Sequence, residues 1–541
     1  MKKTFLVMFI LAAVAVGAWF FVTQAGGSKR LLSYVPKTSE LVLSFNLKSL
    51  SKKTDSEQVK NLKMIQSLFS QTDGEMLPIL KKVVQDPSNS GIKFTDNPHF
   101  FLSKTNSTGG LLLGLKKAAS FSSLIEAEIG SHPIQTTGTI HYALSSDGPL
   151  ILWNEETALI YMAKDTSGIL ANGQEILAKT LPSIEELTLY KDAHIKGADI
   201  FLYLQSSFME KTPTEYFGLN FKKQAGAIAY GLSLKFEEGQ IAFESRTAFE
   251  KKEDAKLTRM YSNNAGEHFL AFTTPKTPLM SVQLQLNTAK LYALLMDNPT
   301  TKSGLEEIAA DFGVKTKELK DLFSGNIALS MSGLETRIVK KNFFGIESNE
   351  EVNTPEAALF VEVKNQELFQ KILDKSEQHP EDGKYTFAIP FVSDFYMVHI
   401  PEGLSIMMDP ELAKNFATEK TLSNSEFGAI GAFLKKHPNG AYVNLDLQGY
   451  PVKLKELLSR DMGKRYTLLE TALKPFSDVF GYQVKERGYL NIKLINKEEN
   501  SLRQVLSVMD VLYQMNQDIL SADKATTEEA PIIEEDTAVY P

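Results

Sequence analysis

Serine and lysine are the first residues of this sequence whose types and spacing could support catalysis. Ser49 and Lys52 have the Ser-x-x-Lys spacing of penicillin-recognising enzymes, in which the serine is the nucleophile. Those enzymes also need Ser-Asp-Asn and Lys-Thr-Gly motifs, and neither motif occurs in the chain. The match is therefore interpreted as a chance occurrence in a chain that is rich in serine and lysine.

Histidine is the next residue type that could do chemistry, and the eight histidines are scattered over positions 99, 132, 141, 194, 268, 379, 399 and 437. None of them forms a His-Glu-x-x-His zinc motif. His132 and His379 each precede a proline, so they could be a duplicated ligand site. We favour the interpretation that each His-Pro pair marks the end of a helix, because His is favoured at a helix C-terminus and Pro cannot continue a helix. His141 and His399 lie in strand-like patterns and are expected to be structural.

Pairs of adjacent acids are the third group of residues that could take part in catalysis or bind a metal. The pairs Glu155-Glu156, Glu237-Glu238 and Glu350-Glu351 are predicted at turns that face water, with Glu237-Glu238 at a hairpin tip. The chain has no Gly-x-Ser-x-Gly motif, no phosphate-binding loop and no dinucleotide-binding motif. The sequence therefore predicts no catalytic, cofactor-binding or metal-ligating residue.

Composition narrows the class of protein further. The 541 residues leave room for two or more domains. The absence of cysteine excludes disulfides, thiolate nucleophiles and cysteine-based metal centres. A net charge of −8 over this length argues against nucleic acid as a partner, since nucleic-acid binders usually carry a basic face.

The N-terminus carries the clearest local signal. Lys2 and Lys3 precede Phe5 to Val22, eighteen residues without a charge, which is long enough for a helix to span a bilayer. The small residues that follow are a poor cleavage site. Residues 1–28 are therefore predicted to be a signal anchor, with a cleaved signal peptide as the alternative. The body would then lie in the periplasm, held at the inner membrane by one helix.

A repeated pattern organises the rest of the chain. Pro-Lys-Thr, an alternating apolar run and a helix start occur from Pro36 to Leu50 and again from Pro275 to Leu291. Five such segment pairs match with shifts between 239 and 249 residues, which indicates two tandem repeats. Strands outnumber helices in each repeat, so the predicted class is α+β with mostly antiparallel sheet.

Domain limits follow from the repeat and from the acidic C-terminus. Residues 31–264 and 265–520 are predicted to be the first and second repeat. The last core helix is expected to be capped by Ser501. Residues 521–541 are rich in acids and show no packing pattern, so they are expected to form a disordered tail.

The repeat also predicts which elements are equivalent. Strand Glu40–Asn46 should superpose on Met280–Gln285, and helix Ser120–Ala127 should superpose on Glu367–Asp374. Finding these pairs in non-equivalent positions would contradict the duplication.

Two short motifs resemble a known family. They are Asp86-Pro-Ser-Asn-Ser-Gly-Ile92, followed by Pro98-His-Phe-Phe101, and the opening segment Val35 to Asn46. Together they resemble the exported Bacteroidota domain-of-unknown-function family numbered 4836. Many members of that family look like lipoproteins with an N-terminal cysteine, which this chain lacks. The resemblance implies an exported, envelope-facing protein and implies no catalytic residues.

These observations favour a non-enzymatic binding or scaffold protein of the cell envelope. Its expected partners are the membrane, through the N-terminal helix, and an envelope protein, with no cofactor. Two alternatives are an enzyme whose site is assembled from residues of both repeats and a carrier of an apolar envelope ligand. A groove at the interface between the repeats is the expected binding place.

Overall fold

The computed structural model describes residues 30–54, 86–128, 133–144, 149–164, 168–209, 227–251, 277–343, 346–375, 385–389, 393–418 and 427–528, with short pieces between 59 and 83 and between 261 and 273. No helix within these residues is both long and apolar enough to cross a bilayer. The predicted anchor, residues 1–28, lies outside them.

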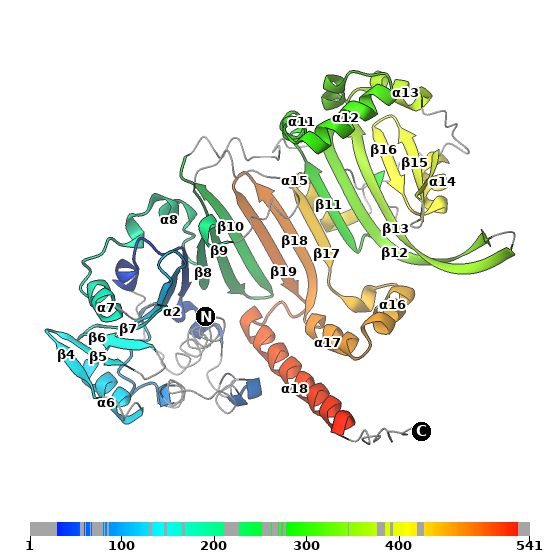
Figure 1. Ribbon diagram of the computed structural model, residues 1–541. Helices are drawn as coiled ribbons and strands as arrows, with labels where there is room; N and C mark the ends of the chain where they lie inside the picture. Colours follow the sequence, from blue (N-terminus) through cyan, green and yellow to red (C-terminus); the bar gives the residue numbers. More distant parts are fainter. Residues whose placement is uncertain are drawn as a thin grey trace, which may run out of the picture.

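One antiparallel sheet runs through the whole molecule, with nineteen strands in the described residues (Figure 1). The strands of the N-terminal half follow one another across it as β4 (Gln135–Thr137), β5 (Ile140–Leu144), β6 (Leu150–Trp153), β7 (Thr157–Ala163), β3 (Thr108–Gly114), β2 (His99–Ser103), β1 (Leu41–Phe45), β8 (Ile200–Gln205), β9 (Ile228–Glu237) and β10 (Gln240–Phe249).

The C-terminal half continues the same sheet from β10. Its strands follow as β19 (Arg487–Leu494), β18 (Phe476–Val484), β17 (Gly440–Asn444), β11 (Met280–Gln285), β12 (Phe323–Phe343), β13 (Ile346–Val363), β16 (Gly403–Met407), β15 (Ser393–Ile400) and β14 (Tyr385–Ile389). The chain is thus a mixed α and β protein with a large antiparallel sheet, as the sequence predicts.

The two faces of the sheet carry separate cores, because side chains alternate along a strand. We name them the Phe243 face and the Tyr203 face after one residue on each. In the N-terminal half, α2 (Leu47–Lys52) and α6 (Ala118–Glu128) cover the Phe243 face. Helices α7 (Ile169–Leu177) and α8 (Thr188–Ala193) cover the Tyr203 face.

Helices of the C-terminal half cover the same two faces at the other end of the sheet. On the Phe243 face, α13 (Gln366–Lys375) packs Leu368, Phe369 and Leu373 against β13 and β16. On the Tyr203 face lie α14 (Pro410–Thr418) and α15 (Gly428–Lys436). The remaining described helices are α11 (Thr288–Asp297), α12 (Pro299–Asp311), α16 (Val452–Met462), α17 (Lys464–Leu473) and α18 (Ser501–Glu528).

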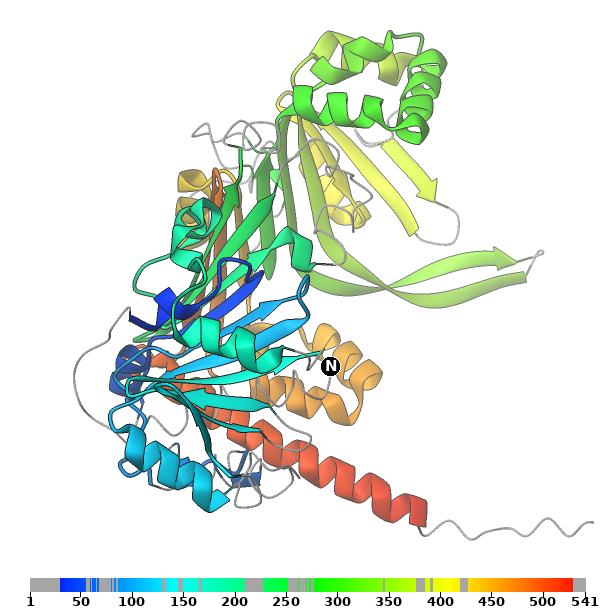
Figure 2. The ribbon, with the colours of Figure 1, turned by 60° about the vertical axis from the view of Figure 1, so that its left-hand side comes forward.

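Helix α18 belongs to the C-terminal half but packs on the N-terminal half. Leu502 joins the core that contains Phe236 and Ile241. The Asp510 carboxylate accepts a hydrogen bond from Met64 N at 2.9 Å, and Lys63 Nζ donates to Gln514 Oε1 at 2.7 Å. The helix therefore crosses the junction between the halves (Figure 2).

Most predicted elements occur where the sequence places them. β1, β11, α6 and α13 fall on the predicted strands and helices. Glu238 and Gly239 form the tip between β9 and β10, with Gly239 at φ 64°.

Three expectations are wrong in detail. Glu350-Glu351 lies inside β13, because the hairpin turns between Phe343 and Ile346. The side chain that caps α18 is Asn500, which accepts from Leu502 N at 3.0 Å, in place of the expected Ser501. The same helix continues to Glu528, into the stretch expected to be disordered. His132 and His379 lie outside the described residues.

Candidate functional site

The residues with catalytic types do not converge on a reacting centre. Ser49 lies in the six-residue helix α2, where its backbone N donates to the capping Asn46 side chain at 3.1 Å. His141 and His399 lie in strands, and their ring nitrogens meet Thr136 and Gln366 at 3.0 Å. A hydroxyl and an amide hold a histidine in place without activating it as a base.

His99 is the most deeply buried of the described histidines. Its Nδ1 lies 2.7 Å from Ser44 Oγ across the β1–β2 pair. Burial, together with the charge of His194, lowers the pKa of His99 to about 3. Such a ring stays neutral at physiological pH, so it serves the structure and does not shuttle protons.

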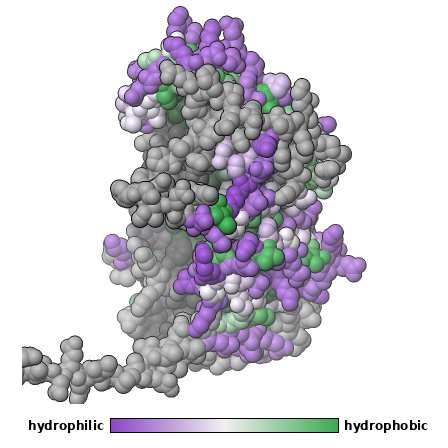
Figure 3. Space-filling view, turned by 90° about the vertical axis from the view of Figure 1, so that its right-hand side faces the viewer, coloured by the Kyte–Doolittle hydropathy of each residue, from purple (hydrophilic) through white to green (hydrophobic). Residues whose placement is uncertain are grey.

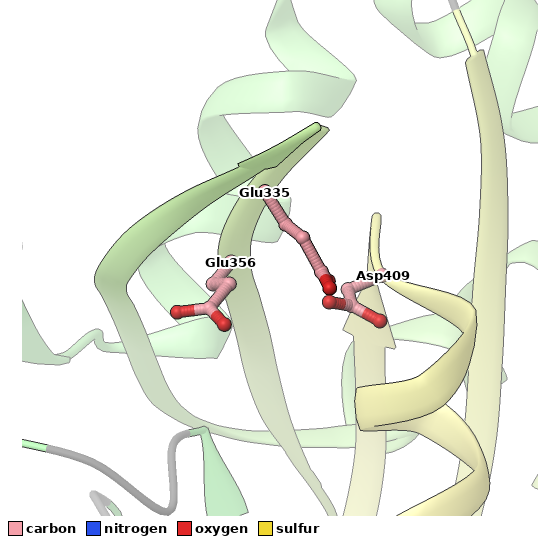
Figure 4. A group of neighbouring side chains, drawn as sticks. All are labelled: Glu335, Glu356 and Asp409. Carbon is pink, nitrogen blue, oxygen red and sulfur yellow. The ribbon is translucent and has the colours of Figure 1, made fainter. Parts of the chain in front are cut away.

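A group of three acids is the strongest candidate for a metal centre. Carboxylate oxygens of Glu335, Glu356 and Asp409 lie within 4.8 Å of one another, and Glu335 and Asp409 point toward each other (Figure 4). Arg337 bonds both of these acids, at 2.8 Å to Glu335 and 2.5 Å to Asp409.

The guanidinium supplies the positive charge that a metal would otherwise bring. Burial opposes the charge of Arg337, but the hydrogen bonds to Glu335 and Asp409 outweigh it and raise the pKa of Arg337. Asp409 Oδ1 also accepts from Leu412 N at 2.9 Å at the start of α14. The cluster is therefore explained as a structural clasp.

The strongest candidate for a functional site is an apolar groove at the centre of the sheet. It occupies about 570 Å³ and its lining comes from β1, β8, β9, β10, β19, β18, β17 and β11. These strands belong to both halves. Helices cover the Phe243 face toward either end of the sheet, and between them the described residues leave the groove open.

Strand register explains why the groove is apolar. Six residues lie opposite one another on six successive strands and form one row on the Phe243 face: Leu234, Phe243, Leu490, Gly481, Ala441 and Val282. Leu232, Phe243 and Leu490 are 42%, 37% and 36% exposed. Large apolar side chains left open to water in one continuous patch mark a binding surface.

Small residues make the row concave. Gly481 and Ala441 stand between Leu490 and Val282, so the floor drops where neither residue fills the space. A Cβ on Gly481 would come within 3.2 Å of Leu490. The leucine therefore leans over the glycine and forms a wall of the hollow.

The two ends of the groove differ in polarity. At one end, Leu502 of α18 and Ile241 belong to the same buried core. At the other end the lining becomes polar, with Ser245, Gln483 and Asn439. Two of these side chains form hydrogen bonds with neighbouring strands. Ser245 Oγ donates to Gly488 O at 3.4 Å, and Asn439 Oδ1 accepts from Gln285 N at 2.7 Å. A site of this kind buries apolar surface, and its described lining places no nucleophile beside a base.

Sequence reasoning locates the groove only in general terms. A groove between the halves is expected, but its residues are not, since neither Phe243 nor Leu490 belongs to a motif that the sequence analysis singles out. Their apolar character on strands with charged neighbours, such as Glu244 and Arg487, is the signal that could have marked an open apolar face.

A large antiparallel sheet with an apolar groove on one face makes this a mixed α and β protein. The chain belongs to the family described as Domain of unknown function (DUF4836), whose model matches residues 33–502. The match confirms the family resemblance of the sequence motifs. No curated protein matches the chain.

Some solved structures show a weak likeness. Crystal form III of TP0453 is 15% identical, covering 44% of this chain and 88% of that chain with a TM-score of 0.24. Crystal form I is 14% identical, covering 41% and 80% with a TM-score of 0.25. Superpositions at this level support no conclusion about function.

Proposed function

We propose that this chain is a non-enzymatic binding protein of the cell envelope, built from two tandem repeats, whose central groove holds a hydrocarbon chain. The observation that carries the proposal is the apolar row that crosses the junction of the two halves. The order of strand pairings supports the repeats, and the chemistry of the groove supports the ligand.

The strand order reads the same from both ends toward the centre. Each pairing among β1, β2, β3, β5, β6, β7, β8, β9 and β10 has a counterpart among β11, β12, β13, β14, β15, β16, β17, β18 and β19, in the same chain order. Helix α6 corresponds to α13, α7 to α14 and α8 to α15 in the same succession. Unrelated halves have no reason to reproduce eight pairings.

The junction supports a pseudo-twofold relation between the repeats. The last strands of the two halves, β10 and β19, pair antiparallel, with Ala242 opposite Asn491. The corresponding glycines, Gly239 and Gly488, are 249 positions apart, and so are Ala242 and Asn491. Equivalent positions that face each other are what a twofold axis produces.

The backbone of the groove floor favours a hydrocarbon over a peptide. Strands β8, β9, β10, β19, β18 and β17 each pair with a neighbour on both sides, so their main-chain groups are used within the sheet. A peptide in the groove would lose its hydrogen bonds to water without replacement. A hydrocarbon chain loses none and gains about 0.8 kcal/mol for each buried CH₂.

The volume suits such a ligand. About 570 Å³ falls within the range of small-molecule sites, roughly 300–1,000 Å³. The open, polar end beside Ser245 and Gln483 leaves room for the polar group of an amphiphile. An envelope protein next to a membrane would meet such molecules, which agrees with the predicted anchor.

A photoactivatable fatty acid tests the proposal in membranes that contain the full chain. We expect the label to map to peptides of β9, β10, β18 and β19. Phe243→Asp should reduce this labelling at least fivefold, because it places a charge in the row.

Val484→Asp is the matched control. Val484 is 41% exposed, but it stands on the opposite face of β18 from Gly481 by strand alternation. Its substitution should leave groove labelling unchanged. Labelling that is confined to residues 1–28, or that Phe243→Asp and Val484→Asp reduce equally, would overturn the groove as the binding site.

A further inference from the structure

The apolar surface of the groove extends further across the sheet than the hollow itself. Val282 on β11 lies directly opposite Leu329 on β12, and Leu329 is 36% exposed. At the other end, Leu232 on β9 is 42% exposed and lies opposite Ser245. Exposed leucines therefore mark both limits of a surface on the Phe243 face, and it crosses the paired strands β9, β10, β19, β18, β17, β11 and β12.

This surface is longer than one lipid chain. Neighbouring strands lie about 4.8 Å apart, so the distance from β9 to β12 is about 29 Å. The hydrocarbon core of a bilayer is about 30 Å thick and is shared by two leaflets, so one chain of a membrane lipid covers about 15 Å. Two chains placed end to end would therefore cover the surface, whereas one chain would leave part of it in contact with water.

The polar residues of the groove lie in the middle of this surface when it is followed across the strands. Ser245 on β10, Gly488 on β19 and Gln483 on β18 lie opposite one another, and Gln483 N donates to Asn439 O at 2.9 Å. Apolar residues continue this row in both directions, namely Leu232, Leu202 and Leu43 on one side and Leu284 and Ile327 on the other. A polar group held in the middle therefore has an apolar path on either side.

The middle of the row offers hydrogen-bonding groups that carry no charge. Ser, Gln and Asn side chains can each donate and accept hydrogen bonds. Apart from tyrosines, the described lining contains one ionisable side chain, that of Glu244. Glu244 follows Phe243 on β10, so it points to the opposite face, where it pairs with Arg246 at 3.1 Å. An uncharged linkage, such as an ester or an amide, therefore suits this position.

Other surfaces of the molecule lack such a path where the structure describes them. Figure 3 shows the side from which the β12–β13 hairpin projects. Among the described residues on that side, hydrophilic ones predominate and apolar ones form small, separate patches. Scattered apolar residues of this kind are normal on a protein surface, whereas a continuous apolar path marks a binding site.

We propose that the groove binds a membrane lipid with two hydrocarbon chains in a splayed conformation. The uncharged linkage between the chains lies at Ser245 and Gln483. One chain extends over β9 and β8 of the N-terminal half, and the other extends over β17 and β11 to Leu329 on β12. This inference rests on the proposed function, because it requires that the groove holds hydrocarbon, and it assigns one chain to each half of the sheet.

A bifunctional photoactivatable lipid tests this arrangement in vesicles that contain the full chain. The probe is a diacylglycerol with a diazirine at the end of each chain. We expect single probe molecules to join a peptide of β9 to a peptide of β11 or β12, because the two chain ends lie in different halves. Labelling confined to one half would overturn the splayed arrangement and leave a hydrocarbon site in place. Absence of labelling throughout the groove would overturn the proposed function itself.

Substitutions at the two ends of the path provide an independent test. Leu329→Asp should reduce labelling of the distant strand β9 by the diacylglycerol about fivefold, because both chains belong to one molecule. Labelling of β9 by a monoacylglycerol with one terminal diazirine should stay unchanged in the same variant. Leu232→Asp should give the reciprocal result, with reduced labelling of β12 by the two-chain probe only.

Val484→Asp is again the matched control, because its side chain lies on the opposite face, and it should change neither pattern. Leu232 and Leu329 are both exposed, so urea unfolding of the two variants should resemble that of the wild-type protein. If the two-chain probe labels the distant strand equally in the variants and the wild-type protein, separate molecules occupy the two halves and the splayed arrangement is wrong.

Discussion

Asp199 shows how a single buried carboxylate ties three elements together. It is fully buried, and its Oδ2 accepts from Lys53 Nζ at 2.6 Å and from Phe236 N at 2.7 Å. Its carbonyl accepts from Asn46 N at 2.7 Å. The residue therefore links the end of α2, the start of β8 and strand β9 beneath one end of the groove.

Replacing this carboxylate should be costly. We expect Asp199→Ala to lower the free energy of unfolding by about 2–4 kcal/mol, because it leaves the Phe236 N–H and the Lys53 ammonium without their partner. Lys53 is partly exposed, so water offsets some of the loss. Urea unfolding followed by the fluorescence of buried Trp153 measures the change. Asp446→Ala, which removes a short-helix cap, should cost about 1 kcal/mol; equal losses would contradict the linking role.

His99 makes a separate contribution that depends on pH. Its pKa falls from 6.5 to about 3 on folding. The unfolded chain therefore binds a proton that the folded chain does not between these values. Stability from the neutral ring is fully present above pH 6.5 and is lost as the pH falls toward 3, by up to about 1.4 kcal/mol per pH unit.

His99→Gln removes this dependence. Between about pH 7.5 and about pH 5 the wild-type protein should lose about 2 kcal/mol more stability than the variant does, as measured by urea unfolding at both values. Other titrating groups are common to both proteins, so the comparison isolates His99. Parallel losses in the two proteins would show that the buried ring does not govern this range.

At the scale of elements, α8 rests on β9 through a glycine. A Cβ on Gly231 would lie 1.9 Å from the carbonyl oxygen of Ala193, the last residue of α8. Gly231→Ala should therefore displace the helix and destabilise the protein by about 1–3 kcal/mol.

Gly304 provides the matched comparison for this prediction. It lies inside α12, and a Cβ there would meet no atom within 4 Å. Gly304→Ala should stabilise the protein by up to about 1 kcal/mol, because alanine favours the helix. Thermal unfolding of both variants shows whether each substitution raises or lowers the stability. Destabilisation by both substitutions would contradict the prediction that the contact with Ala193 decides the effect.

Local patterns predict most elements because their signals are short-range. The β2–β3 hairpin follows from apolar runs on either side of a turn segment, and α13 follows from Leu368, Phe369 and Leu373 on one face. The part of the β12–β13 hairpin that extends past the neighbouring strands, residues 333–343 and 346–356, does not follow from the sequence. Its strands are polar and carry charges, so their pattern does not separate a projecting ribbon from a loop, which is why Glu350-Glu351 is wrongly predicted at a turn.

The groove could not be predicted residue by residue for a different reason. Leu232, Phe243 and Leu490 become neighbours only through pairings between segments as much as about 250 positions apart. Alternation along each strand indicates that one face is apolar, but not whether a helix covers it. That depends on α6 and α13 lying over the outer strands and leaving the middle open.

For the whole molecule, the meeting of β10 and β19 has a functional consequence. Each half contributes a strand with one open edge, and pairing these edges removes both of them from solvent. The same pairing joins two half-grooves into one row. Helix α18 then holds the halves together from outside the sheet through its contacts with Met64 and Lys63. A ligand in the groove would therefore contact both halves at once.

The N-terminal segment determines where this groove would work. Leu, Ile, Val and Phe make up eleven of the eighteen residues from Phe5 to Val22. Their transfer into lipid is favourable by about 3–7 kcal/mol in total, and no charge opposes it. We therefore predict that the mature protein keeps residues 1–28 and places the groove beside the inner membrane, from which it could take up lipid-like ligands.

Mass spectrometry of the N-terminus and membrane washing test this prediction together. An intact N-terminus and retention in the membrane fraction after high-salt and carbonate washes are expected, because a spanning helix resists both treatments. Substituting Leu11→Arg and Val14→Arg should release the body, since each charge near the centre costs about 2.5–3.5 kcal/mol. Lys435→Glu with Lys436→Glu, far from the segment, should not. An N-terminal peptide that begins at Gly26, Gly27 or Ser28 would instead show cleavage, and the groove would then act away from the membrane.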